Sequence, residues 1–303
     1  MKNVKSIISS LLLASSIGFV ACTEKMDIDV NNAPPQLAIY GSITTDIAQH
    51  AVTVMRSSNY FSNSAPEGIS GAIVTVSDGD EVFILTESPS EKGVYLTDPN
   101  VFGVEGKTYT LKVVVEFDGV TDEYEATSLL PYSVRVDSVT FRQSDMSDYI
   151  VDALLYGRLP ESNNNYLNIK TYKNDNIPLN DKLSNFNIIV SENVDRKGID
   201  GAVCMDFFTG ERFTNGEVSG ENMVSIEQGD LITFQICSIT KEYANYVLNA
   251  QKELQGSMPI FSGPPANVQT NISAKNAIGQ TPVCGFFTAY SKQSWKVLFY
   301  LSS

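Results

Sequence analysis

Short segments of alternating apolar and polar residues recur along most of the chain, and they limit the possible folds more than any other feature. In residues 36–130 these segments are rich in β-branched and aromatic side chains, and turn-forming residues separate them. Successive side chains of a β-strand point to opposite faces, so this alternation predicts strands with one buried face. The predicted strands are residues 36–45, 50–57, 72–78, 81–87, 93–97, 107–117 and 122–130.

Two Asp-Gly pairs, Asp78-Gly79 and Asp118-Gly119, lie between neighbouring predicted strands. Glycine accepts the positive φ that a tight hairpin turn needs, so both pairs predict antiparallel hairpins. Seven short strands in about 95 residues are typical of two packed antiparallel sheets. We therefore expect a mainly β chain whose first domain, residues 36–131, is an antiparallel β-sandwich of immunoglobulin or transthyretin type.

Residues 132–303 form a second predicted domain, again rich in β-strands. One amphipathic helix is expected at residues 240–255, because Thr240 can cap it and apolar residues recur on one face. That face carries Tyr243, Tyr246, Val247, Ala250 and Leu254. We expect the two tyrosines to pack in the core, and a ligand-binding shelf is the alternative. The predicted strands are residues 133–141, 149–159, 164–173, 186–192, 231–237, 283–290 and 295–301.

The first residues have the features of a secretory signal. Lys2 and Lys5 form a short basic region, and an apolar run follows over residues 7–20. A helix needs roughly 20 apolar residues to span a bilayer, so this run is too short for a membrane anchor. We expect residues 1–21 to be a cleaved signal peptide and residues 22–35, which are polar and acidic, to be a tether.

The apolar run ends in Phe-Val-Ala-Cys at residues 19–22, which resembles a bacterial lipobox. In signals of that kind the cysteine receives diacylglyceryl and acyl lipids, and several acyl chains hold a protein firmly to a membrane. The resemblance implies a covalent lipid on Cys22 and attachment to the outer membrane. Plain secretion with Cys22 unmodified is the alternative.

The balance of charges excludes one large class of partner. The chain has 21 Lys and Arg against 35 Asp and Glu, a formal net charge of −14. A surface this acidic repels phosphate backbones, so we expect no nucleic-acid partner. Anionic lipid headgroups are repelled as well, which makes the lipid on Cys22 the expected means of attachment.

Few residues suggest catalysis or metal binding. His50 is the one histidine, so a histidine-rich metal site is excluded and a Ser-His-Asp triad has little support. Asp78, Asp80 and Glu81 form an acidic cluster, for which we expect a solvated hairpin tip, with a calcium site as the alternative. We expect no catalytic residue, no metal and no cofactor apart from the lipid.

Two further residue types leave alternatives open. Adjacent acids such as Asp122 and Glu123 could serve a carboxylate-dependent hydrolase, but carboxylates are too numerous here for one pair to be informative. Three cysteines after the lipobox allow one disulfide with one free thiol, or three buried thiols, and the second arrangement is favoured. They are Cys204, Cys237 and Cys284.

Several motifs together resemble one protein family. They are the lipobox, GAIVTVSDG (71–79), GVYLTDPNVFGVEGKTYTL (93–111), SITKEYANYV (238–247), PPANVQTNI (264–272) and GFFTAYSKQSWKVLF (285–299). They are similar to those of a Bacteroidota lipoprotein family, the domain of unknown function numbered 4249. The resemblance implies a β-rich lipoprotein of the outer membrane, on its periplasmic or its outer face, with a TonB-dependent transporter as a possible partner. It implies no catalytic residue.

These observations favour a non-enzymatic lipoprotein that binds a ligand or partner as an accessory of a TonB-dependent uptake or cell-surface complex. Exposed aromatic side chains supply large contact area at small entropic cost. We expect Tyr60, Phe61 and Phe261, each in a predicted irregular loop, to make the contacts. A structural envelope spacer or adhesin is the alternative, and a carboxylate-dependent hydrolase is a minor one.

Overall fold

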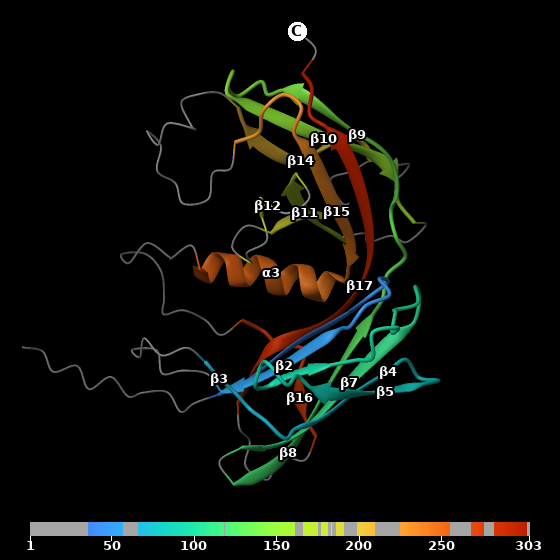
Figure 1. The fold of residues 1–303 in the computed structure, drawn as a ribbon, viewed down its shortest axis with the longest axis vertical. Helices are drawn as coiled ribbons and strands as arrows, with labels where there is room; N and C mark the ends of the chain where they lie inside the picture. The colour runs from blue at the N-terminus through green and yellow to red at the C-terminus, as the bar shows by residue number, and fades with distance from the viewer. Residues whose placement is uncertain are drawn as a thin grey trace, which may run out of the picture. The chain divides into compact units, whose positions relative to one another are not determined.

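A computed structural model describes most of the chain after the first residues. The described residues are 36–56, 66–117, 119–160, 166–174, 177–180, 183, 186–190, 199–209, 225–254, 268–275 and 282–301. Within them the expected mainly β fold with one amphipathic helix is confirmed (Figure 1). None of the helical segments described is long and apolar enough to cross a membrane.

Seven of the first eight strands lie where the sequence predicts strands, and β3 falls in the loop predicted between two of them. Their bounds are β1 (Leu37–Thr44), β2 (Ala51–Arg56), β3 (Glu67–Gly68), β4 (Ile73–Ser77), β5 (Val82–Glu87), β6 (Val94–Leu96), β7 (Thr108–Phe117) and β8 (Val120–Leu129). They follow one another in the order β1-β2-β6-β5-β4-β7-β8, and each of these pairs is antiparallel. Buried side chains of β1 and β2 meet those of β4, β7 and β8 in one core, which makes this part a β-sandwich.

Most of the remaining strands form a second sandwich. Their bounds are β9 (Arg135–Gln143), β10 (Ile150–Arg158), β11 (Tyr166–Lys173), β12 (Ile177–Pro178), β13 (Asn187–Val190), β14 (Ile199–Phe208), β15 (Leu231–Ile239), β16 (Ser273–Ala274) and β17 (Val283–Leu298). A three-stranded sheet, β14-β10-β9, shares a core with β11, β15 and the end of β17. Edge-on aromatic contacts fill that core, as between Phe141 and Phe299, whose ring centroids lie 4.9 Å apart.

The long strand β17 belongs to both sandwiches. Its first half runs parallel to β1, from Leu37 opposite Val283 to Thr44 opposite Tyr290. Its second half is antiparallel to β15. The sequence predicts two separate strands here, at 283–290 and 295–301, and no parallel pair. The polar residues between them continue the strand because β15 supplies hydrogen-bonding partners along the whole second half.

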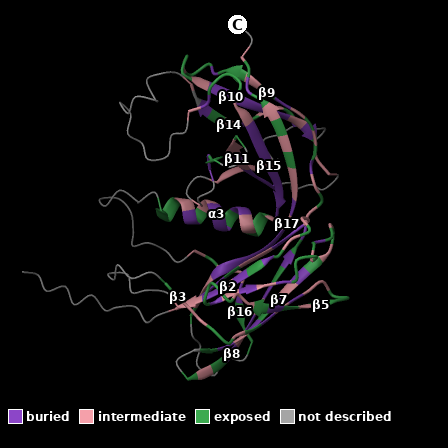
Figure 2. Cartoon of the chain, in the orientation of Figure 1, coloured by how far each residue is buried: buried purple, intermediate pink, exposed green. Residues whose placement is uncertain are grey.

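Segments from both sides of residue 131 build the first sandwich. β16 pairs with β8, and β17 pairs with β1, although both follow the predicted boundary in sequence. Figure 2 shows buried residues running along β15, whereas the half of β17 that pairs with β15 is mostly intermediate and exposed. The predicted boundary itself lies between β8 and β9.

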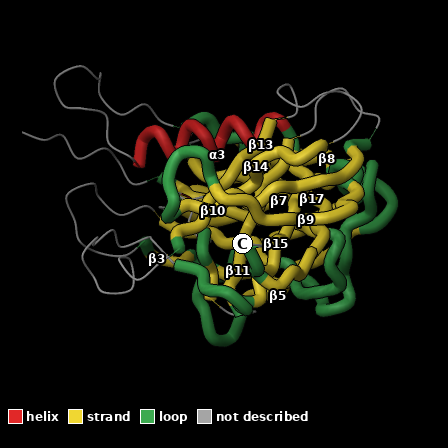
Figure 3. The backbone as a smooth tube through the Cα atoms, turned by 90° about the horizontal axis from the view of Figure 1, so that it is seen from above, coloured by secondary structure: helices red, strands yellow, loops and turns green. Residues whose placement is uncertain are grey.

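The helix α3 (Lys241–Leu254) lies along one side of the strands (Figures 1 and 3). Thr240 caps it as expected, because its Oγ1 accepts the backbone N–H of Tyr243 at 3.2 Å. Ala244, Tyr246, Val247 and Ala250 are buried against β11 and β17. Leu254 differs from the expected apolar face: it is 61% exposed, since the last turn of α3 projects beyond the sheets.

Candidate functional site

Four residues that the sequence singles out lie outside the described residues. They are the lipidation candidate Cys22 and the contact candidates Tyr60, Phe61 and Phe261. Their roles stay predictions.

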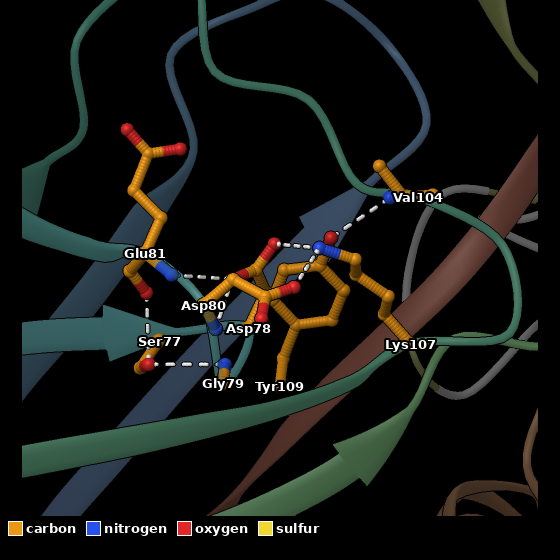
Figure 4. Close-up of polar contacts among 8 residues, drawn as sticks. All are labelled: Ser77, Asp78, Gly79, Asp80, Glu81, Val104, Lys107 and Tyr109. Carbon is orange, nitrogen blue, oxygen red and sulfur yellow. Dashed lines mark hydrogen bonds and ion pairs between the residues drawn. The ribbon is translucent and has the colours of Figure 1, made fainter.

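The acidic cluster at the β4–β5 turn is held by a lysine (Figure 4). Lys107 Nζ donates to Asp78 Oδ2 at 2.7 Å and to Asp80 Oδ2 at 3.0 Å. Asp78 Oδ1 also accepts the backbone N–H groups of Asp80 and Glu81. The lysine lowers the pKa of Asp78. The Lys107 ammonium therefore occupies the position at which a calcium ion would bind the Asp78 and Asp80 oxygens. The Glu81 carboxylate points away from that position. The hairpin tip is a salt-bridged turn.

His50 has a structural environment. It is buried, its backbone N–H donates to Thr97 Oγ1 at 2.9 Å, and its Nε2 lies 3.1 Å from the carbonyl oxygen of Val101. Burial lowers the pKa of His50, so the ring is neutral at pH 7. Its contacts tie the start of β2 to the loop that follows β6.

The three cysteines are free thiols, but Cys284 is only half-buried, which differs from the favoured expectation of three buried thiols. Cys204 and Cys237 are buried, and burial raises their pKa to about 12 and about 11. Thiols this hard to ionise are poor nucleophiles and poor metal ligands. Asp122 and Glu123 do not form an acid–base pair, because adjacent strand residues point to opposite faces, and Asp122 is buried. No group of three or more metal-ligating side chains occurs among the described residues.

An open cavity of about 390 Å³ lies where β1, β11, β17 and α3 meet. We call it the aromatic cavity, after five of its lining side chains. These are Tyr40, Tyr243, Tyr246, Phe286 and Tyr290. Ligand pockets typically measure about 300–1,000 Å³ and combine apolar walls with a few polar groups. The aromatic cavity fits that description.

Strand alternation places the floor of the aromatic cavity. Phe287 and Ala289 of β17 point into the core of the first sandwich, so their neighbours Phe286, Thr288 and Tyr290 point to the other face. The parallel register sets Tyr40 of β1 beside Phe286. The floor is therefore the outer face of the β1–β17 pair.

The helix supplies an aromatic wall. The Tyr243 and Tyr246 rings are nearly parallel, with centroids 6.3 Å apart and an interplanar angle of 13°. Both rings contact Phe286, at centroid distances of 5.4 Å and 4.8 Å. The two tyrosines thus pack as expected and also line the cavity, while a role as a ligand-binding shelf stays a prediction.

One charged side chain lines the aromatic cavity. Lys170 of β11 enters it, with its Nζ 4.9 Å from the ring centroid of Phe186 and 6.0 Å from that of Tyr290. Such distances give a favourable interaction between a cation and a ring face. No ion pair of Lys170 occurs with another described residue.

The tyrosines of the cavity keep their protons at neutral pH. Burial raises the pKa of Tyr40, Tyr246 and Tyr290, and it raises that of Tyr243 to about 12. The Tyr40 and Tyr246 hydroxyls each shift the pKa of the other, which indicates that they lie close together. The walls therefore present neutral phenols, which can donate or accept hydrogen bonds.

A larger cavity of about 710 Å³ lies between β8 and the start of α3, and Phe286 lines both. Two of its polar side chains are engaged within the fold: Ser128 Oγ accepts the Ala289 N–H, and Asn271 bonds the backbone of Phe287 in both directions. The aromatic cavity is the better candidate for ligand binding, because more aromatic side chains line it.

Sequence reasoning missed most of the aromatic cavity. The helical spacing of Tyr243 and Tyr246 suggested a shelf as one alternative. Tyr40 and Phe286 lie 246 positions apart, and their neighbourhood depends on the parallel β1–β17 pair. No signal in the sequence marks Lys170.

Comparisons with known proteins bear on the family of the chain. A two-domain fibronectin type-III segment from chicken tenascin matches 67% of this chain and 90% of that chain, at 11% identity and a TM-score of 0.19. Among curated proteins, none matches. A family model described as domain of unknown function (DUF4249) matches residues 23–296, which is most of the sequence. The chain belongs to this DUF4249 family.

Proposed function

We propose that this protein is a non-enzymatic lipoprotein that binds a small ligand in the aromatic cavity beside α3. One observation carries the proposal: aromatic rings from β1, β17 and α3 line an open cavity of about 390 Å³ beside one lysine. Buried aromatic surface supplies much of the binding energy in such sites, and a few polar groups orient the ligand. The residues gathered there suit binding better than bond cleavage, since the described lining includes no carboxylate, histidine or thiol.

The proposal includes a cellular location for the protein. Lipids on Cys22 hold it to the outer membrane, on the periplasmic or the outer face. There it delivers its ligand to a TonB-dependent transporter or to another surface complex. The features that support this are the secretory signal and the lipobox-like end of that signal.

Removal of one exposed wall of the cavity tests ligand binding. Tyr40 is 40% exposed, so Tyr40→Ala alters the cavity without emptying the core. We expect native mass spectrometry of the full-length protein, extracted from its own membrane in mild detergent, to show a bound small molecule. In Tyr40→Ala we expect roughly ten-fold lower occupancy, because a stacking surface is lost.

Tyr300→Ala is the matched control, since Tyr300 is exposed and lies outside the cavity. It should keep the parent occupancy. A parent protein without bound small molecule, or equal occupancy in Tyr40→Ala, contradicts ligand binding here. A pull-down in the same detergent addresses the partner: near-stoichiometric recovery of a TonB-dependent transporter is expected, and recovery of this chain alone favours a spacer.

A further inference from the structure

We infer that the ligand of the aromatic cavity is a ring compound carrying one carboxylate, with the ring against the tyrosines and the carboxylate at Lys170. This inference rests on the proposed function and names the chemical class of its ligand. An aromatic acid and a sugar acid share that chemistry, and the experiment below separates them.

The charge of the cavity is opposite to that of the chain. The chain has a formal net charge of −14, yet Lys170 is the one charged side chain of the described lining. Two aromatic rings hold its ammonium group at the cavity, and no described carboxylate pairs with it. A ligand carboxylate can therefore reach the ammonium without displacing an ion pair, and charged hydrogen bonds of this kind are strong.

The aromatic rings by themselves would suit a cation, because ring faces attract positive charge. Lys170 already occupies two of those faces, those of Phe186 and Tyr290, and its charge repels a second cation. A phosphate dianion is also a poor match, since the described lining offers one basic group. A single carboxylate balances the single ammonium.

The ring of the ligand has flat surfaces to contact. Tyr243 and Tyr246 present nearly parallel rings, and Phe286 lies against both. Flat rings and the apolar faces of sugars bury area against such walls, and offset stacking adds to that gain.

One buried polar atom at the floor of the aromatic cavity lacks a hydrogen-bond partner among the described residues. Thr288 lines the cavity, is 4% exposed, and its Oγ1 has no hydrogen-bond partner among the described residues. A buried hydroxyl without a partner is costly, so a ligand oxygen at this position would be favoured. The neutral phenols that line the same cavity can donate to that ligand as well.

The experiment uses two acids and their uncharged counterparts on the full-length protein in mild detergent. The probes are benzoate with benzamide, and glucuronate with glucose, and equilibrium dialysis gives each Kd. We expect at least one acid to bind roughly ten-fold more tightly than its uncharged counterpart. Preference within the benzoate pair indicates an aromatic acid, and preference within the glucuronate pair indicates a sugar acid.

Lys170→Gln should abolish the preference for an acid over its uncharged counterpart and leave the Kd of the uncharged probe unchanged. Lys170→Arg should retain the preference for the acid. Lys112→Gln, which removes an exposed lysine of β7 outside the cavity, is the matched control and should behave like the parent. Equal urea midpoints for parent and variants show that folding is intact.

Four results would overturn the inference. If the uncharged probes bind as tightly as the acids, or if Lys170→Gln still binds an acid more tightly than its uncharged counterpart, Lys170 does not recognise the ligand carboxylate. If none of the four probes binds while the Tyr40-sensitive native ligand is present, the ligand class is wrong and the proposed function stands. If none of the probes binds and the parent protein carries no native ligand either, both the inference and the proposed function are contradicted.

Discussion

At the scale of single residues, a side chain's chemistry depends on what stands opposite it on the next strand. Asp152 of β10 and Asp206 of β14 are directly paired across the antiparallel ladder. Arg142 donates to Asp152 at 2.9 Å. Burial, and then the charge of Asp152, raises the pKa of Asp206. Two like charges are thus placed side by side, which costs stability once both are ionised.

The pair gives a pH-dependent prediction. The folded state binds the Asp206 proton more tightly than the unfolded state, so stability falls as pH rises from 3.8 through the folded-state pKa. Asp206→Asn should therefore be more stable than the parent at pH 7, by about 2 °C or less in Tm. The gain should vanish below pH 3.8, where the carboxyl is protonated in both states.

Thermal unfolding across this pH range checks the prediction, with Asp148→Asn as the control. Asp148 is exposed and lies in the turn between β9 and β10. A gain at pH 7 that persists unchanged at low pH would show that the charge of Asp206 is not its cause.

At the scale of elements, the β1–β17 pair depends on one glycine. Gly285 has φ of +102°, and a Cβ there would lie 1.9 Å from the carbonyl oxygen of Ile39. A side chain at this position would push the two strands apart. The floor of the aromatic cavity is built on the same pair, so its geometry depends on this contact.

Gly285→Ala should lower the free energy of unfolding by about 3 kcal/mol or more, because steric overlap adds to backbone strain. Gly79→Ala is the control: Gly79 has a similar φ of +94°, and no heavy atom lies within 4 Å of its Cβ position. Backbone strain alone should lower the free energy of unfolding of Gly79→Ala by about 1–2 kcal/mol. Urea unfolding compares the two, and equal losses would exclude a specific effect of the β1–β17 contact.

Several elements could be predicted from local pattern, and others could not. Strict alternation marks β4, and Thr240 with its spaced apolar residues marks α3. The strand β14 is missed, because Gly201 and Asp206 interrupt its pattern and pairing with β10 stabilises it instead. The second half of β17 is likewise polar near Ser291 and is held by β15.

The same distinction applies to the candidate site. Tyr243 and Tyr246 could be recognised as a pair from helical spacing alone. Tyr40, Lys170 and Phe286 could not, because strand pairing between distant segments brings them together. Non-local pairing leaves no local pattern in the sequence.

At the scale of the whole molecule, β17 connects two cores. Phe287 packs in the core of the first sandwich, and Trp295 packs against that of the second. Both residues belong to one uninterrupted strand. The two cores should therefore unfold together.

Val54→Ala tests this coupling, since Val54 is fully buried in the first core. We expect it to cost about 2 kcal/mol and to lower the urea midpoint that Trp295 fluorescence reports from the second core. Trp295 is the single tryptophan of the chain, so its signal is unambiguous. Val151→Ala, in the second core, gives the scale of a direct effect. An unchanged Trp295 transition in Val54→Ala would show independent domains.

The position of β17 in the chain also affects when the protein can fold. β1 is the first described strand to be synthesised, and its partner over residues 283–290 is the last. Until that partner emerges, one edge of β1 has no neighbour, and an open strand edge invites association with other chains. Closing so long a loop is also slow. The first sheet is therefore completed only after every other described strand has been synthesised.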